Sequence, residues 1–404
     1  MSVAAQLRRL ANKPHARPEM KSIKTLNIAH VVFSFDYGGL ERRILRLIES
    51  LSAYRCRFFV ISLRHSDGRF LDSRFPVTHI NVNAEPGVDF GAIKRVAGHL
   101  REHDVHIVHS HNWVSMLEGT LAGRLAKTPV CVHGEHGAKR FEPGELVWRR
   151  TMTQRVLCRF SDHIIPVNDA INARLRELWW LPGNRLTTIR NGVDTVKFHP
   201  AKDDTRDDST TIHIGSVSRL DPVKNFPCLM RAVALLNDRS DKTKYRLTIV
   251  GGGDQLSTLE ALRDQLDAND FIDFPGPTDA AETWYPQFDI YVNSSFSEGM
   301  SNTVLEAMAC GLPIVATDVA GHRDWLREGE HALFFRNDDY ENLAEKLACF
   351  GEDVNRRRAV CSTNRRYIEN EFSQAQFIQR YQAIYKNLLA KKGLAFDFSP
   401  TGVV

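Results

Sequence analysis

Residues 26–51 read LNIAHVVFSFDYGGLERRILRLIESL and contain a complete strand–turn–helix unit. The apolar run over residues 26–35 predicts a buried strand, and residues 36–39, with their two glycines, predict a turn. Residues 40–51 predict an amphipathic helix, because their apolar side chains recur three and four positions apart. Such a unit is typical of an α/β protein with a parallel sheet.

The same alternation continues through the first 200 residues. Further apolar runs, expected to be strands, lie at residues 58–63, 105–109, 130–133 and 163–167. Helical stretches separate them, which is the pattern of a parallel sheet covered by helices. We therefore predict that residues 1–200 form a doubly wound, Rossmann-like domain.

A polar stretch at residues 202–208 precedes a second domain, and its composition indicates a surface linker rather than a functional acidic cluster. Strands are then expected at 211–217, 245–250, 290–294 and 313–317, and helices at 225–236 and 256–266. The predicted fold class is α/β, with a second Rossmann-like domain at 201–373. In the last segment, 374–404, a helix at 374–389 is expected to pack back on the first domain, and residues 393–404 to form a loose tail.

The composition is that of an ordinary globular protein and excludes several classes. A chain of 404 residues is too long for one core, and its net charge of +4 is too small to indicate nucleic-acid binding. The 7 cysteines form no C-x-x-C pair, which disfavours a disulfide framework and a zinc site. No signal peptide or apolar run near 18 residues occurs, so we expect a cytoplasmic protein that does not span a membrane.

Residues 298–313, EGMSNTVLEAMACGLP, are the most informative about function. Gly299 and the Ser-Asn-Thr run are good helix starters, whereas residues 304–309 favour a helix and Gly311 and Pro313 end it. The segment predicts a short helix with an exposed N-terminus. Its free N–H groups would attract a diphosphate, and a carboxylate on either side could hold sugar hydroxyls.

Glu298 and Glu306 could be the paired carboxylates of a hydrolase. In a continuous helix, eight residues would separate them by about 12 Å, whereas glycosidases need their carboxylates roughly 5 to 9.5 Å apart. The spacing therefore excludes a hydrolase pair. Two solvated glutamates on an ordinary helix are the other interpretation, and the surrounding motif favours a functional role for both.

Residues 215–225, GSVSRLDPVKN, form a second constellation. Arg219 follows the strand and Lys224 precedes the next helix. Two cations at the carboxyl end of a parallel strand suit a diphosphate, because such ends open into the ligand crevice of α/β proteins. The other interpretation is one surface arginine and one surface lysine.

These segments, together with Gly38-Gly39-Leu40-Glu41 and the HGEHG run at 133–137, resemble the retaining glycosyltransferases of family 4, also called glycosyl transferases group 1. More narrowly, they resemble a bacterial subgroup linked to exopolysaccharide assembly. The resemblance implies a GT-B fold, in which two Rossmann-like domains face each other across a cleft. It also implies that Arg219 and Lys224 neutralise the departing nucleoside diphosphate, so that no metal or other cofactor is required.

The resemblance also implies which residues do the work. Glu298 would contact the sugar, Glu306 the ribose, and His136 the sugar from the first domain. The expected catalytic residues are His136, Arg219, Lys224 and Glu298. The expected donor-binding residues are Gly38, Gly39, Arg219, Lys224, Glu298, Gly299, Met300, Ser301, Asn302, Thr303 and Glu306.

Histidines gather at residues 106–111 and 133–136, where metal ligation was an alternative. A histidine at a strand end is more often a hydrogen-bonded structural residue, and no Cys or carboxylate completes a zinc set. His111 and Asn112 were weaker candidates for sugar contact than His136. The metal prediction is therefore none.

The sequence thus predicts a metal-independent retaining glycosyltransferase. It would take a UDP- or GDP-sugar as donor and a saccharide or lipid-linked saccharide as acceptor. A nucleotide-sugar epimerase of the same fold and a non-catalytic sugar- or nucleotide-binding protein were the alternatives. Residues 191–200, beginning Asn-Gly-Val-Asp, resemble the interdomain segment of the family, which implies a structural turn and hinge.

Residues 139–160 combine basic and aromatic side chains on an expected helix. One interpretation is an amphipathic helix with a solvated basic face. The other is a peripheral contact with the cytoplasmic face of the inner membrane, or with a pyrophosphate-linked acceptor.

Overall fold

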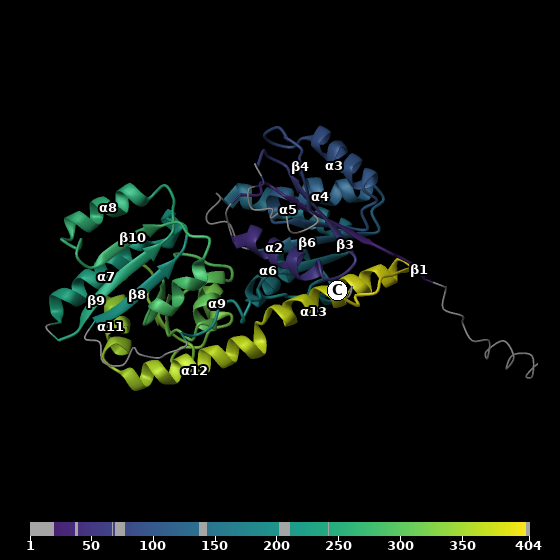
Figure 1. Ribbon diagram of the computed structural model, residues 1–404. Helices are drawn as coiled ribbons and strands as arrows, with labels where there is room; N and C mark the ends of the chain where they lie inside the picture. The colour runs from purple at the N-terminus through teal and green to yellow at the C-terminus, as the bar shows by residue number, and fades with distance from the viewer. Residues whose placement is uncertain are drawn as a thin grey trace, which may run out of the picture.

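The computed structural model describes residues 20–36, 39–66, 68, 77–136, 144–201, 211–240 and 242–400. They form two lobes, each built around a six-stranded parallel sheet (Figure 1). Gly38, the linker residues 202–208 and residues 139–143 of the basic segment lie outside the described residues.

The first sheet has the strand order β4-β3-β2-β5-β6-β7. Its strands are β2 (Leu26–Val32), β3 (Cys56–Ser62), β4 (Val77–Asn81), β5 (Ile107–His111), β6 (Val130–Glu135) and β7 (His163–Pro166). The helices of this lobe are α2 (Gly39–Leu51), α3 (Phe90–Glu102), α4 (Trp113–Leu125), α5 (Gly144–Leu157) and α6 (Asp169–Trp179).

The second sheet repeats this arrangement in the order β10-β9-β8-β11-β12-β13. Its strands are β8 (Thr211–Val217), β9 (Lys244–Val250), β10 (Ile272–Gly276), β11 (Ile290–Asn293), β12 (Ile314–Thr317) and β13 (Ala332–Phe335). The helices are α7 (Phe226–Arg239), α8 (Leu256–Gln265), α9 (Asn302–Ala309), α10 (Ala320–Arg323), α11 (Tyr340–Gly351) and α12 (Val354–Glu371). The predicted α/β class with two doubly wound domains is confirmed.

Both faces of each sheet are buried, which explains why the strands read as nearly continuous apolar runs. In β2, Ile28 and Val32 pack in the cluster that contains α2 and α13 (Gln374–Lys391). Ala29 and Val31, on the opposite face, pack in the cluster that contains α3. Among the described residues, no helix has the length and apolar character needed to cross a membrane.

The chain passes between the lobes at two neighbouring points. The Val193 N–H donates to the Phe372 carbonyl at 2.8 Å, and the Gln374 N–H donates to the Val193 carbonyl at 3.0 Å. Helix α12 runs along the second lobe, whereas α13 packs against the first through Phe377 and Tyr381 (Figure 1). These two crossings form the hinge region, residues 191–193 and 372–374.

Predicted and observed elements differ in two respects. The edge strands β4, β10 and β13 were not predicted. The loose tail is wrong for residues 394–398, because β14 (Leu394–Ala395) pairs in parallel with β1 (Lys21–Ser22) and Phe396 is only 5% exposed. Phe396 and Phe398 pack on the apolar cluster of the first lobe, and these two aromatic side chains near the terminus are the sequence signal that the prediction overlooked.

Candidate active site

In each sheet, the strand that comes first in the chain, β2 or β8, lies in the centre. The next two strands lie on one side of it, and the last three lie on the other side. The succession of strands therefore reverses between β8 and β11 in the second lobe. In such sheets the loops after the two central strands separate and leave a crevice for ligands. Arg219 and Lys224 follow β8, and Glu298 follows β11, so the sheet topology brings the two predicted constellations to the same edge.

Lys224 and Glu298 form the centre of this edge. Lys224 Nζ lies 2.7 Å from Glu298 Oε1, and Ser295 Oγ donates to the same oxygen at 2.7 Å. Asn293 Nδ2 is 3.4 Å from it, whereas Oε2 has no hydrogen-bond partner among the described residues. Burial raises the pKa of Glu298, but the Lys224 ammonium, His322 and these hydrogen bonds lower it by more, so its pKa lies below the usual value. Glu298 is therefore a fixed carboxylate with one free oxygen.

Arg219 does not contact this pair. Its guanidinium lies 2.8 Å from Asp221, and its side chain is 55% exposed. Asp221 also accepts from the Val223 N–H, so it begins the turn that carries Lys224. Arg219 is thus at the edge of the crevice, free to move toward an anion.

Close backbone packing holds the two loops, and the glycines responsible were not predicted. A Cβ on Gly251 would lie 1.8 Å from the Ser218 carbonyl oxygen, and one on Gly321 would lie 2.1 Å from the Glu298 carbonyl oxygen. Three consecutive glycines at 251–253, directly after an apolar run, are the sequence signal that could have indicated the first contact.

Helix α9 begins as the sequence predicts, with Ser301 as its N-cap accepting from the Val304 N–H. Its first turn faces the other lobe: Asn302 Nδ2 donates to the Gly39 carbonyl at 3.2 Å. Ser301 is buried and Asn302 and Thr303 are half-buried, so the helix N-terminus is less exposed than predicted.

Gly299 and Met300 also contact the first lobe. The Gly299 carbonyl accepts from Asn168 Nδ2 at 2.6 Å, and the Met300 carbonyl accepts from Asn191 Nδ2 at 3.2 Å. The Met300 side chain is 7% exposed and packs in the core of the second lobe. These residues join the lobes in this conformation.

The Glu306 carboxylate is buried and already paired, rather than exposed for contact with a ribose. Its side chain is 1% exposed, and Arg46 Nη2 of helix α2 lies 2.5 Å from Oε1. The Tyr285 hydroxyl donates to Oε2 at 2.8 Å, so both carboxylate oxygens are engaged. Arg46 and Tyr285 were not predicted, since neither lies near the motif in sequence.

On the first lobe, His136 ends a chain of three imidazoles. Its Nε2 lies 3.0 Å from His111 Nδ1, and His111 Nε2 lies 2.9 Å from His30 Nδ1. Burial lowers the pKa of all three, to about 3 for His30. His136 Nδ1 and His30 Nε2 are buried without partners among the described residues. His30 was missed because it lies inside an apolar strand.

Two groups of described residues, one in this cluster and one of His99, Glu102 and His103, have ligand atoms close enough together to hold a metal ion. Ligand atoms of His30, His109 and His111 lie within 4.8 Å of one another, and His109 Nδ1 is 3.0 Å from the Tyr385 hydroxyl. Neutral imidazoles can bind zinc or a similar ion. Arg43, whose charge is felt by His109 and His136, opposes a further cation there.

Two Rossmann-like lobes with their site residues at facing loops define the GT-B class of nucleotide-sugar enzymes. Two family models match the chain: "Glycosyltransferase Family 4" over residues 37–197 and "Glycosyl transferases group 1" over residues 211–353. The chain belongs to this family of glycosyltransferases.

Curated relatives include a D-inositol 3-phosphate glycosyltransferase of Rhodococcus erythropolis, 26% identical over 90% of this chain and 90% of the relative. A D-inositol 3-phosphate glycosyltransferase of Pseudarthrobacter chlorophenolicus is 29% identical over 64% of this chain and 66% of the relative. The putative colanic acid biosynthesis glycosyltransferase WcaL of Escherichia coli is 26% identical over 65% of this chain. The chain spans only 64% of the length of WcaL.

Solved structures share the fold. A glycosyltransferase from Rickettsia africae has a TM-score of 0.77 and 19% identity, covering 91% of this chain and 99% of that one. Anabaena HepE in complex with UDP has a TM-score of 0.76 and 17% identity, covering 90% of this chain and 100% of that one.

Proposed function

We propose that this protein is a retaining glycosyltransferase that moves a sugar from a nucleotide-diphosphate sugar to a saccharide or lipid-linked saccharide acceptor. It would act in bacterial polysaccharide or glycoconjugate biosynthesis. The observation that carries the proposal is the Lys224–Glu298 pair at the switch point of the second sheet. The family models and the relatives above are glycosyltransferases, which disfavours the epimerase and binding-protein alternatives.

In the proposed mechanism, the diphosphate of the donor lies beside Lys224, with Arg219 turning from Asp221 toward it. The two cations stabilise the negative charge that develops on the leaving group, so the protein itself supplies what a divalent metal would otherwise provide. Glu298 holds Lys224 in place through Oε1 and offers Oε2 to a sugar hydroxyl. His136 approaches the sugar from the first lobe.

Retention follows from front-face attack. The bond from the anomeric carbon to the diphosphate breaks while the acceptor oxygen bonds to the same face of that carbon. The acceptor hydroxyl proton passes to the departing diphosphate. Closure of the two lobes aligns the substrates and excludes water, which would otherwise hydrolyse the donor.

The donor nucleotide can be identified by thermal shift with UDP and GDP, followed by product analysis with the matching sugars. The complex of Anabaena HepE with UDP makes UDP the first nucleotide to test. Lys224→Met should abolish the nucleotide-induced shift and lower kcat by about 100-fold or more. Lys386→Met is the matched control, because Lys386 is exposed on α13, and it should behave as wild type.

Three outcomes would contradict parts of this proposal. If neither nucleotide stabilises the protein, the donor assignment fails. An inverted anomeric configuration in the product, read by NMR, excludes retention. Loss of transfer in EDTA that magnesium restores excludes metal independence.

We also propose a peripheral contact with anionic membrane at the cytoplasmic face, through α5 and the turn after it. Trp148, Val156 and Phe160 are 63%, 54% and 42% exposed, and Arg155 lies 3.7 Å from the ring centroid of Trp180, which is also exposed. Arg155 is half-buried, whereas Arg159 is exposed. Exposed aromatic side chains next to a basic one suit a bilayer interface. Vesicles with anionic lipid should sediment the wild-type protein, and Trp148→Ala with Phe160→Ala should weaken this. Equal sedimentation of the variant would refute the contact.

A further inference from the structure

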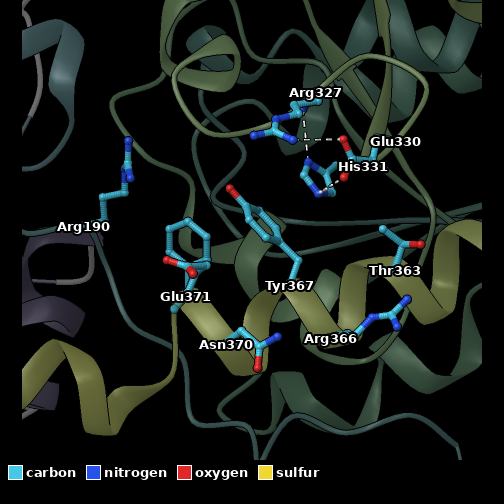
Figure 2. Close-up of a pocket in the computed structure, with 10 residues that line it drawn as sticks. Arg190, Arg327, Glu330, His331, Thr363, Arg366, Tyr367, Asn370 and Glu371 are labelled. Atoms are coloured by element: carbon cyan, nitrogen blue, oxygen red, sulfur yellow. Dashed lines mark hydrogen bonds and ion pairs between the residues drawn. The ribbon is translucent and has the colours of Figure 1, made fainter.

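A cavity of about 480 Å³ lies beside the hinge region, lined by the C-terminal half of α12, the loop before β13 and Arg190 of the first lobe. None of the donor-site loops described above lines it. Figure 2 shows Arg190 on one side, Arg327 across from it and Arg366 on α12, arranged around Tyr367. We call this cavity the hinge pocket.

The three arginines of the hinge pocket have unused hydrogen-bonding capacity. Arg190 bonds Asp169 at 2.8 Å through Nη2, but its Nε is buried without a partner in the described part of the chain. Arg366 is exposed and makes no hydrogen bond or ion pair with any described residue. Among the residues that the structure describes, the Arg327 side chain contacts only Glu330 by an ion pair, at 3.3 Å, and it is 74% exposed.

The floor of the pocket is rigid and aromatic. The rings of Tyr367 and His331 stack with centroids 4.1 Å apart and an interplanar angle of 12°. The Tyr367 hydroxyl donates to the Trp325 carbonyl at 2.7 Å, which fixes the ring. A preformed surface of this kind reduces the entropy that a ligand loses on binding.

A carboxylate, an amide and a hydroxyl group complete the lining. Glu371, Asn370 and Thr363 are on or next to the same helix, and Figure 2 shows Glu371 between Arg190 and Tyr367. Carboxylate and amide groups accept from and donate to hydroxyls, whereas guanidinium groups bind phosphate with paired hydrogen bonds. Together, these side chains suit a ligand that carries both hydroxyl groups and a phosphate.

We infer that the hinge pocket is a second ligand site, which binds a sugar phosphate. The guanidinium groups of Arg327 and Arg366 hold the phosphate, and Arg190, Asn370 and Glu371 hold sugar hydroxyls. The size of the cavity is within the range of small-molecule sites, about 300–1,000 Å³. The site is separate from the donor crevice and does not depend on the function proposed there.

The location gives the ligand an effect on the donor site. Arg190 belongs to the first lobe and directly precedes the hinge at residues 191–193, whereas Arg366 belongs to the second lobe. A ligand that contacts both fixes the angle between the lobes. This coupling, unlike the site itself, rests on the lobe closure proposed for the donor crevice. If the same lobes close on the donor, the two ligands change each other's affinity by the same factor.

The test is isothermal titration of the protein with glucose 6-phosphate, inorganic phosphate and glucose. We expect glucose 6-phosphate to bind more tightly than either of the others. Arg366→Gln and Arg327→Gln should each weaken this binding at least tenfold. Arg358→Gln removes an exposed charge from the same helix outside the pocket and should bind as wild type. Circular dichroism would verify that each variant is folded.

A second arm separates the hinge pocket from the donor site. Lys224→Met should retain the wild-type affinity for glucose 6-phosphate, and saturating glucose 6-phosphate should change the affinity for the donor nucleotide. The inference is overturned if glucose 6-phosphate does not bind, or if inorganic phosphate binds equally well. It is also overturned if the double variant Arg327→Gln/Arg366→Gln binds normally, or if Lys224→Met abolishes binding.

Discussion

Arg46 and Glu306 form an ion pair between the two lobes, with Arg46 Nη2 2.5 Å from Glu306 Oε1. Arg46 also donates to the Gly192 carbonyl at 2.7 Å, so one guanidinium joins α2, the hinge and α9. The carboxylate it occupies is the one proposed to bind the donor ribose. Ribose binding at Oε1, as proposed, would compete with this interdomain ion pair for the same carboxylate oxygen.

Arg46→Gln tests this competition. Removing the cation leaves Glu306 buried without its charge partner, which should lower stability by about 3 kcal/mol. Ribose hydroxyls can then reach Oε1, so UDP or GDP should raise the melting temperature of the variant by more than that of wild type. Arg55→Gln, an exposed change in the same lobe, should leave both quantities unaltered. An equal nucleotide shift in Arg46→Gln and wild type would show that Glu306 does not bind the ribose.

His111 positions His136 through the hydrogen bond between their rings, which suggests a matched pair of variants. In His111→Asn, the side-chain amide can occupy the position of Nδ1, so the hydrogen bond to His136 is kept and the one to His30 is lost. In His111→Gln, the amide can occupy the position of Nε2, so the bond to His30 is kept and the one to His136 is lost. If His136 contacts the sugar, His111→Asn should keep kcat within about threefold and His111→Gln should lower it about 10- to 100-fold. Nitrogen NMR of the imidazoles should report an altered tautomer of His136 only in His111→Gln. Equal loss in both variants, with normal His136 spectra, would indicate a purely structural role.

Much of the fold could be predicted because its strands are buried on both faces. Residues 211–217 were predicted as a strand with the bounds that β8 has, since an apolar run stands between polar segments. Strand β10, IDFPG, was missed because it lies at a sheet edge, alternates in polarity and contains proline. Local pattern therefore identifies the central strands better than the edges.

The site was predictable only where its residues are close in sequence. Glu298 and Lys224 were found from two local motifs, and the strand order then places them together. Arg46 lies 260 positions from Glu306, so no local pattern could indicate that pair. The position of His30 beside His109 depends on the register of β2 and β5, which the sequence alone does not reveal.

Gly321→Ala should displace the loop that carries Glu298. The new methyl group would meet the Glu298 carbonyl oxygen at 2.1 Å, and backbone cannot move aside as a flexible side chain can. We expect a loss of about 1–3 kcal/mol in stability and a weaker nucleotide-induced thermal shift. Gly98→Ala is the control, because a Cβ there meets nothing within 4 Å and the residue lies within α3. That control should gain about 0.5–1 kcal/mol. A normal nucleotide response in a destabilised Gly321→Ala would mean that the loop position does not matter for donor binding.

The buried histidines of the first lobe make stability fall in mild acid. Burial lowers the pKa of His30, His109, His111 and His136 below 6.5, so the folded protein keeps these rings neutral. In the unfolded chain they bind protons as the pH falls through about 6.5, and proton binding to the unfolded state favours unfolding. Their contribution is fully present above pH 6.5 and is lost progressively below it.

Each of these four histidines adds up to about 1.4 kcal/mol per pH unit to the slope of unfolding free energy below pH 6.5. Urea unfolding at pH 7.5, 6.0 and 5.0 measures that slope. His30→Gln should reduce the slope by the amount that corresponds to the uptake of about one proton. His199→Gln, at an exposed position, should keep the wild-type slope. Stability that is constant from pH 7.5 to 5.0 would mean that the imidazole chain takes up protons in the folded state. His111 and His136 would then be protonated in the folded protein. In that case the prediction that His111 sets the tautomer of His136 would fail, because a protonated imidazole has no tautomers.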